Sequence, residues 1–356
     1  MTIDGLFDAG YQSNSYQGVR VSGIEGNGSG TSQFNLRGTE DLGGGLTSSF
    51  HLETDFSSVS DTANTGVAST DGFKSSTGLG LTAATSLAGA ASKFGNGEIA
   101  VGLAGGFGKV QFGAINNAGL EYVAMISPDF GTAMGGGFGS TVGAETTYAL
   151  VRWNNSVRYD TPVISGFQAS VITAAKQTNA TAAGAPNYSA TMGNYNVAGA
   201  TELSARYTAG PLKVMFVNQT TNQTAGINDT QRDIGASYNV SDALYVTAGV
   251  QSTNLASAAT PTQARATSVG TVYTMGQNKF AATYTSLNNS TVGATATELG
   301  LGYDYLLSKT TKLYAHMSHL SDNSTSGITA YVTPANLAGT AGHSYTKSAF
   351  GVRMDF

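Results

Sequence analysis

The feature that most constrains this chain is an alternation of apolar and polar residues with a period of two. In its clearest segment, 46–56, Leu46 and Phe50 lie on one face while His51 and Glu53 lie on the other. Alternation of this kind is typical of a β-strand with one apolar and one polar face. The segment is about as long as a tilted membrane-spanning strand of roughly 9–11 residues, whereas an ordinary strand has about 5–6. The pattern therefore predicts an all-β fold that crosses a membrane.

The alternation recurs in sixteen segments, which predicts a 16-stranded antiparallel transmembrane β-barrel. The segments are 2–11, 33–40, 46–56, 98–103, 109–113, 156–160, 167–174, 201–207, 212–218, 233–238, 244–252, 267–275, 279–286, 297–305, 312–318 and 348–356. Short connections such as 41–45 alternate with long polar ones such as 57–97 and 114–155. A membrane barrel with short turns at one rim and longer loops at the other has this alternation.

Composition excludes several other classes of protein. Charged residues make up 11% of the chain, against about 25% in a typical soluble domain, yet no apolar run is long enough for a transmembrane helix. The absence of cysteine excludes disulfides and cysteine metal sites. A net charge of −5 with no basic block argues against nucleic-acid binding, and 17 Tyr with 15 Phe argue against disorder. A mean hydropathy of −0.07 fits a barrel whose polar and apolar residues alternate.

The ends of the chain carry further expectations. The last segment, 348–356, is an amphipathic strand that ends on the aromatic Phe356. We predict that it closes the barrel, and it is similar to the signal by which outer-membrane barrels are recognised for insertion. The alternation begins directly after Met1, so we expect the mature form without a signal peptide. We expect one domain over residues 1–356.

Four stretches carry a resemblance to a known family. They are 34–46 (FNLRGTEDLGGGL), 152–162 (RWNNSVRYDTP), 301–311 (LGYDYLLSKTT) and 128–131 (PDFG). With them the chain resembles the trimeric general porins of Gram-negative outer membranes, in particular the β-proteobacterial type. The resemblance implies a homotrimer in the bacterial outer membrane that lets small hydrophilic solutes and ions diffuse passively. It also implies contact with outer-membrane lipid, lipopolysaccharide and the barrel-assembly machinery, and a third loop folded into the lumen.

The resemblance assigns the connection 114–155 to that third loop, which narrows the channel and presents carboxylates opposite basic wall residues. The acids of the connection are Glu121, Asp129 and Glu145, and the basic wall candidates are Arg20, Arg37, Lys109 and Arg158. On the predicted strand phases the lumen side carries Asp4, Asp8, Arg37, His51, Glu53, Asp55, Lys109, Arg158, Glu202, Arg206, Glu298, Asp304, His316 and Arg353.

The chain departs from the family at two positions where an arginine is usual. Gln33 occupies the first and Ala114 the second. The predicted lumen face also has more acids than bases. We therefore expect weak ion selectivity or a mild preference for cations, instead of strong anion selectivity.

Two other functions fit parts of the sequence. An aromatic-lined constriction formed by Tyr122, Phe130, Phe138 and Tyr148 would suit a porin specific for sugars or for small aromatic or organic acids. The other interpretation of these rings is that they pack the loop against the wall. A barrel without transport, serving as an adhesin or anchor, is the third possibility.

We expect neither an enzyme nor a cofactor. His316 and Ser318 share one strand face, as the histidine–serine pairs of some barrel hydrolases do, but here that face is the predicted lumen side, so we interpret them as ordinary lumen residues. The four histidines lack the spacing of a metal site, so no metal is expected.

Overall fold

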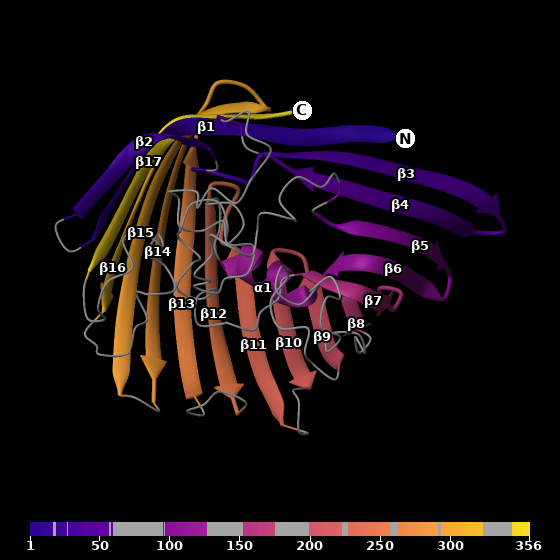
Figure 1. Ribbon diagram of the computed structural model, residues 1–356. Helices are drawn as coiled ribbons and strands as arrows, with labels where there is room; N and C mark the ends of the chain where they lie inside the picture. Colours follow the sequence, from indigo (N-terminus) through magenta and orange to yellow (C-terminus); the bar gives the residue numbers. More distant parts are fainter. Residues whose placement is uncertain are drawn as a thin grey trace, which may run out of the picture.

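The computed structural model describes residues 1–16, 19–26, 28–56, 58–59, 95, 97–126, 152–174, 199–222, 227–256, 262–290, 293–322 and 344–356. These residues form one antiparallel sheet that closes on itself as a barrel, with the two chain ends close together (Figure 1). The predicted 16-stranded antiparallel barrel is confirmed. Closure pairs the strands around the barrel and leaves no sheet edge exposed to lipid.

The sheet runs in sequence order around the barrel. From β3 onward each strand pairs with the next, and β17 pairs with β1. The strands are β1 (Thr2–Tyr16), β2 (Val19–Gly26), β3 (Gln33–Gly43), β4 (Leu46–Asp55), β5 (Ile99–Gly105), β6 (Gly108–Asn116), β7 (Arg152–Asp160), β8 (Phe167–Ala174), β9 (Gly199–Ala209), β10 (Leu212–Asn222), β11 (Asn228–Asn239), β12 (Leu244–Leu255), β13 (Thr262–Met275), β14 (Asn278–Asn289), β15 (Ala294–Leu306), β16 (Thr311–Asp322) and β17 (Tyr345–Asp355).

Among the described residues, β2 is the one strand that the alternation did not predict. β1 pairs with β3 along Thr2–Leu6 and with β2 along Ala9–Tyr16, so β2 and β3 together occupy one of the sixteen positions. The pattern missed β2 because one of its faces carries Arg20, Ser22 and Ile24, which mixes charged, polar and apolar residues.

The interruption between β2 and β3 is organised by the buried Asp8. Its carboxylate accepts hydrogen bonds from the N–H groups of Gly28 (3.2 Å), Ser29 (2.6 Å) and Gly30 (2.7 Å). It accepts another from the Tyr314 hydroxyl at 2.7 Å. Successive N–H groups that surround one anion form a backbone nest. The Asp8 carboxylate of β1 therefore satisfies the N–H groups of residues 28–30, which have no partner strand, and Tyr314 of β16 holds that carboxylate in place.

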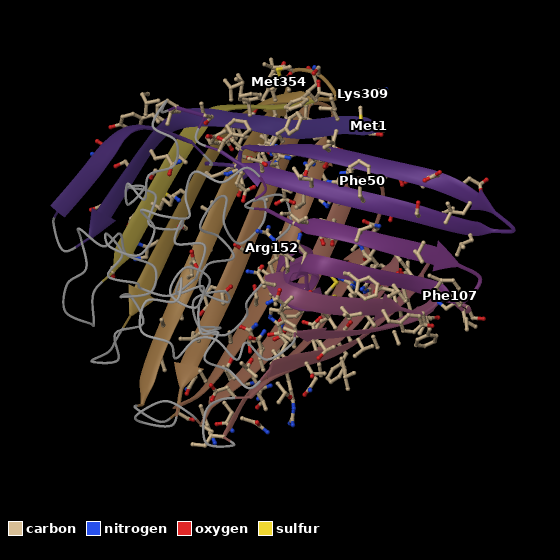
Figure 2. All side chains as sticks on the ribbon, turned by 45° about the vertical axis from the view of Figure 1, so that its right-hand side comes forward. Met1, Phe50, Phe107, Arg152, Lys309 and Met354 are labelled. Atoms are coloured by element: carbon tan, nitrogen blue, oxygen red, sulfur yellow. The ribbon has the colours of Figure 1, made fainter. Side chains whose placement is uncertain are left out.

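The two faces of the barrel differ sharply in polarity. On β11, Ile234 is 58% exposed on the outside, whereas its neighbour Asp233 is fully buried on the inside. Phe50 and Phe107 lie on the outer side, and Arg152 lies on the inner side (Figure 2). An exposed apolar belt of this extent is unfavourable in water but suits a lipid environment. The predicted division into a lipid face and a polar lumen is thus present.

Among the described residues no helix has the length and the apolar composition needed to cross a membrane.

The third loop begins with the helix α1 (Ala118–Ile126), which lies inside the barrel (Figure 1). α1 packs against β10, β11, β12 and β13. β6 continues to Asn116 and β7 begins at Arg152, so the loop is shorter at both ends than the predicted 114–155. Residues 127–151 lie outside the described residues.

Candidate functional site

The helix α1 is fixed to the lumen wall at its first turn. The N–H groups of Ala118 and Gly119 donate to the Glu202 carboxylate of β9 at 2.7 and 3.2 Å. Gln219 of β10 donates to the same carboxylate at 2.7 Å. Within the loop, the Leu120 N–H donates to the Asn117 side chain at 3.1 Å. The first N–H groups of a helix have no partners in the helix itself and attract an anion, so Glu202 both caps and positions α1.

In the middle of α1, Tyr122 packs against two glycines of the barrel wall, Gly235 and Gly249. Tyr122 is fully buried, and a Cβ atom added at Gly249 would lie 2.6 Å from its hydroxyl. A Cβ atom at Gly235 would lie 2.8 Å from the Tyr122 ring. The Thr247 hydroxyl donates to the Ile126 carbonyl at 3.3 Å and holds the last turn. Burial, and to a smaller degree Asp233, raise the pKa of Tyr122. Tyr122 therefore packs the loop against the wall and does not line an aromatic constriction.

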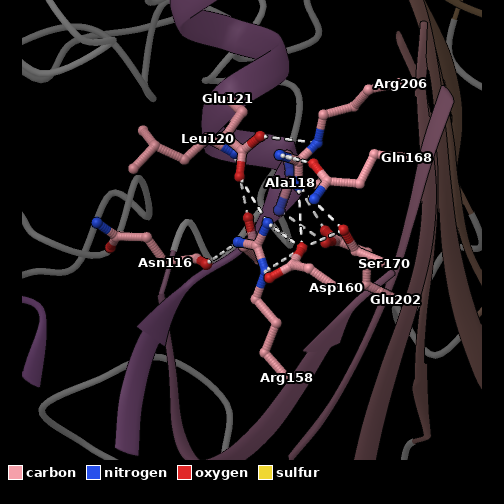
Figure 3. A network of polar contacts seen from close by, with 12 residues as sticks. Asn116, Ala118, Leu120, Glu121, Arg158, Asp160, Gln168, Ser170, Glu202 and Arg206 are labelled. Carbon is pink, nitrogen blue, oxygen red and sulfur yellow. Dashed lines mark hydrogen bonds and ion pairs between the residues drawn. The ribbon is translucent and has the colours of Figure 1, made fainter. Parts of the chain in front are cut away.

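The free side of α1 presents Glu121 to two wall arginines (Figure 3). Its carboxylate pairs with Arg158 of β7 at 2.9 Å and with Arg206 of β9 at 3.1 Å. Arg158 also donates to both oxygens of Asp160 at 3.1 Å, and Arg206 lies 3.4 Å from Asp160. Ser170 of β8 donates to Asp160 and accepts from Arg206 at 3.0 Å. Two carboxylates and two guanidinium groups thus form a network whose formal charges cancel.

A second polar cluster clamps the two ends of the loop. At the start, the Asn116 N–H donates to Glu98 at 3.0 Å, and Arg152, at the end, donates to the Asn116 side chain at 2.9 Å. Arg152 also pairs with Glu53 of β4 at 3.1 Å. The ring of His51 contacts Glu98 at 2.9 Å. The loop therefore leaves and re-enters the wall at one cross-linked point.

Three members of this cluster are of metal-ligating types. Ligand-type atoms of His51, Glu53 and Glu98 lie within 4.8 Å of one another. Glu53 already pairs with Arg152, and the second ring nitrogen of His51 lies 2.9 Å from the Asn35 amide oxygen. Because these groups are engaged in the clamp, we interpret them as structural.

A small apolar cluster lies beneath the same point of the wall. Ile115 and Trp153, which flank the loop, are almost fully buried together with Ala100, Ile172 and Ala200. These residues belong to neighbouring strands from β5 to β9. Burial of the large Ile115 and Trp153 side chains gives the root of the loop apolar support.

Three of the four predicted basic wall residues lie on the lumen side. Arg158 is at the centre of the network, and Arg37 pairs with Asp4 at 2.9 Å near the start of the chain. Lys109 is half-buried and lies opposite Asp160 in the β6–β7 register.

Arg20 does not join them. In the β1–β2 register Arg20 lies opposite Ser15, and Ile24 lies opposite Tyr11. The Tyr11 ring packs on Phe350, which is exposed on the outer face. Because residues two apart share a strand face, Arg20 lies on the outer face. The prediction failed because no strand was expected at 19–26.

The other predicted site residues divide into described and undescribed ones. Glu121 takes part in the network, whereas Asp129, Glu145, Phe130, Phe138 and Tyr148 lie outside the described residues. Phe356 lies at the seam, where its N–H and carbonyl each bond to Gly5 at 3.0 Å. Its ring centroid is 5.8 Å from that of Phe7.

Sequence reasoning did not assign Arg206, Glu202, Asp160 or Arg152 to the site. Alternation had placed Glu202 and Arg206 on the lumen face, but nothing in the sequence indicated that β9 lies beside the third loop. The spacing of Arg158 and Asp160 was an available signal, since residues two apart share a strand face.

Comparison with known proteins identifies what the chain is similar to. The pattern of the Gram-negative porin family matches residues 1–326. An outer membrane porin protein of Bordetella pertussis is 30% identical over 238 residues, which cover 64% of this chain and 52% of that protein. The chain thus aligns with about half the length of this relative.

Two solved structures share the fold over the whole chain. The anion-selective porin from Comamonas acidovorans has a TM-score of 0.69 at 23% identity, covering 100% of this chain and 99% of that one. The trimer form of OmpT, an outer membrane protein of Vibrio cholerae, has a TM-score of 0.64 at 13% identity, with coverage of 100% and 99%.

Proposed function

The chain belongs to the Gram-negative porin family, and from this premise we propose that it forms a water-filled channel for passive diffusion of small hydrophilic solutes and ions. It is an outer-membrane protein of the Gram-negative type. The closed barrel, with an apolar outer belt and a lumen lined by charged and hydroxyl side chains, supports the channel. A 16-stranded barrel is wide enough to hold an aqueous passage.

We further propose that the third loop filters solutes by size. The observation that carries this proposal is the docking of α1 inside the lumen, with Glu121 paired to Arg158 and Arg206. A segment held at its cap, its body and its acidic side chain occupies part of the lumen at a fixed place. A fixed obstacle reduces the free cross-section for every solute, whatever its charge.

The charge arrangement favours weak selectivity. The Glu121 network contains two acids and two arginines, so its net charge is close to zero. The clamp contains Glu53 and Glu98 against Arg152, so it has one excess negative charge when His51 is neutral. These two clusters of described residues together create no strong field of one sign, and we propose weak selectivity with a mild preference for cations.

We propose that the protein assembles as a homotrimer. The related OmpT of Vibrio cholerae has a trimer form, and the outer belt of this chain offers apolar surface for contacts with a second copy. We also propose that the terminal strand, ending on Phe356, is the segment that the barrel-assembly machinery recognises.

Conductance in a planar lipid bilayer tests the channel, its selectivity and the trimer together. Stepwise current in KCl supports the channel, three equal closure steps support the trimer, and a small cation-sided reversal potential in a salt gradient supports the selectivity. Absence of steps would favour an adhesin or anchor. Saturable block of the current by one sugar or organic acid would instead indicate a substrate-specific porin.

A further inference from the structure

Basic side chains gather in the lumen near the rim of the short turns. Lys279 of β14, Lys312 of β16 and Arg353 of β17 line a recess of about 420 Å³. Lys309, in the turn between β15 and β16, lines it as well, as does Ala124 of α1. Because α1 lies inside the barrel (Figure 1), the recess belongs to the space between the third loop and the wall of β14–β17.

The three strand cations of the recess point into the lumen. Lys279 is followed by Phe280 and Lys312 by Leu313, and both of these apolar neighbours are exposed on the outer face. Arg353 likewise lies between two exposed apolar residues of β17. Since neighbouring residues of a strand point to opposite faces, the three cations face the lumen.

The recess has an excess of positive charge. Lys312 pairs with Asp304 at 2.5 Å, and Arg353 pairs with Asp355 at 2.8 Å. Lys279 lies opposite the same Asp304 in the β14–β15 register. Together with the exposed lysine of the turn, four cations stand against two carboxylates, which leaves an excess of two positive charges.

The rest of this rim adds no further excess. Lys109 and Lys213 lie beside two of the short turns, and Asp41 and Asp242 lie beside or within two others. These two cations and two acids balance, so the positive excess of the rim lies at the recess.

The opposite end of the lumen, next to the longer connections, has the reverse sign. The described acids on the lumen side of this end include Glu53, Asp55, Glu98, Asp229 and Glu298. Among the described residues, the cations on the lumen side of this end are Arg152 and Lys347. Five acids against two cations leave an excess of three negative charges at the loop side.

The two ends are far enough apart to act on ions separately. Glu298 lies eight residues before Leu306, the last residue of β15, so at about 3.3 Å per residue the strand covers roughly 26 Å between them. Charges in water are screened over about 10 Å at 0.1 M salt and about 3 Å at 1 M salt. At the lower salt concentration, therefore, the loop side attracts cations while the recess attracts anions.

We propose that the lumen is a bipolar passage that rectifies ion current, an inference that rests on the proposed channel. A voltage that drives cations from the loop side to the turn side drives anions the other way. Each kind of ion then enters through the end that attracts it, so both accumulate in the middle of the lumen and the conductance rises. Under the reverse voltage each ion must enter through the end that repels it, so the middle is depleted of ions and the conductance falls.

Opposite charge at the two ends also agrees with weak overall selectivity. The acidic end favours cations and the recess favours anions, so the two preferences oppose each other in the reversal potential. The larger excess at the acidic end leaves the mild cation preference proposed above.

The test records single-channel current of the full-length protein at equal positive and negative voltages, in about 0.1 M and about 1 M KCl. The variant Lys279→Gln with Lys309→Gln removes two positive charges from the recess and keeps its two ion-paired cations. The matched control is Arg232→Gln with Arg265→Gln. It removes the same charge from the outer face, where both arginines are exposed and alternate with buried residues.

A chemical variant fixes the orientation of each channel and tests the sign of the charge. The chain contains no cysteine, so Lys309→Cys gives one exposed thiol at the recess of each subunit. A cationic thiol reagent restores the lost positive charge, whereas an anionic reagent of similar size adds a negative one. The chamber from which the reagent reacts faster is the one that faces the short turns.

At the lower salt concentration, we expect the wild type and the outer-face control to pass at least about 1.5 times more current when cations flow from the loop side to the turn side. In the lysine double variant and in unmodified Lys309→Cys the two currents should become more nearly equal. The cationic reagent should restore the difference, and the anionic reagent should reduce it further. At the higher salt concentration the currents should approach equality in every protein, because the charges are screened.

Equal currents in the wild type at low salt, or a larger current in the opposite direction, would overturn the proposal. Unchanged rectification in the lysine double variant would also overturn it, and an equal loss in the outer-face control would assign the effect to net protein charge. Rectification that persists at high salt would assign it to the shape of the lumen instead. Absence of conductance steps contradicts the proposed channel itself, whereas steps without rectification contradict only this inference.

Discussion

Glu121 on the third loop and Arg158 on the barrel wall form a direct ion pair of 2.9 Å. Arg158 is 9% exposed at its side chain and Glu121 is 35% exposed, so the pair stands at the boundary between the wall and the water of the lumen. A pair in this position attaches the loop to the wall and also neutralises the acid that the loop would otherwise present to passing ions. Structure and selectivity are therefore coupled through one contact.

Removing the arginine of this pair should loosen the helix. We expect Arg158→Gln to leave Arg206 as the one guanidinium in the network that pairs with Glu121 and Asp160. It should raise both the mean conductance and the open-channel noise because α1 is held less firmly. Single-channel recording measures both quantities. Lys109→Gln is the matched control, since it removes a nearby lumen cation that lies outside the network. Equal noise in the two variants would contradict the role given to Arg158.

Removing the acid should change selectivity. Glu121→Gln deletes one negative charge from a balanced group, so we expect the reversal potential in a KCl gradient to move toward anion preference. Glu40→Gln, which removes an acid from the outer face near the rim of short turns, should leave the reversal potential where it is. An identical shift for both substitutions would mean that net protein charge, and not the network, sets the selectivity.

The glycine seat of Tyr122 predicts a steric effect. Gly249→Ala places a Cβ atom 2.6 Å from the Tyr122 hydroxyl and 2.7 Å from Ile126. We expect destabilisation of about 1–3 kcal/mol, as for other overpacked sites, together with altered conductance as α1 is displaced. Adding Tyr122→Phe should restore part of the loss. Gly23→Ala, where a Cβ atom meets nothing within 4 Å, is the control. Thermal unfolding should show the loss of stability, and single-channel recording should show the altered conductance. A normal conductance in Gly249→Ala would show that α1 is not held at Gly249.

The nest around Asp8 predicts a purely structural effect. Asp8→Asn replaces an anion that accepts three backbone N–H bonds, so we expect the free energy of unfolding to fall by about 1–3 kcal/mol. Asp4→Asn breaks an exposed pair with Arg37 and should cost at most about 1 kcal/mol. Urea-induced unfolding in lipid vesicles measures both. Similar losses for the two variants would indicate that the nest adds nothing beyond a surface pair.

The alternation of residues was sufficient to predict the barrel. Each of the sixteen segments matches a strand of the structure, and none extends beyond its strand by more than one residue. The match arises because a strand that separates lipid from water must alternate, and this leaves a period of two in the sequence. The same rule failed at β2, whose exposed face mixes Arg20 with Ile24. Arg20 is tolerated on the outer face because its guanidinium donates a hydrogen bond to the Ser13 hydroxyl.

The sequence also predicted which side chains point into the lumen, but it did not predict which of them contact the third loop. Alternation placed Glu202, Arg206 and Arg158 on the lumen side, because side-chain direction depends only on residue parity. Nothing local indicated that Glu202 caps α1, that Arg206 reaches Glu121, or that Gly249 receives Tyr122. These partners are separated by 84, 85 and 127 positions along the chain.

The sequence by itself determined the fold class, the two-faced wall and the family. The tertiary structure alone decided which lumen charges neutralise one another, where the third loop is attached and which polar residues face lipid. The physical reason is that alternation is a local property of each strand, whereas charge pairing and helix docking depend on closure of the barrel, which brings β7, β9 and β12 around one segment.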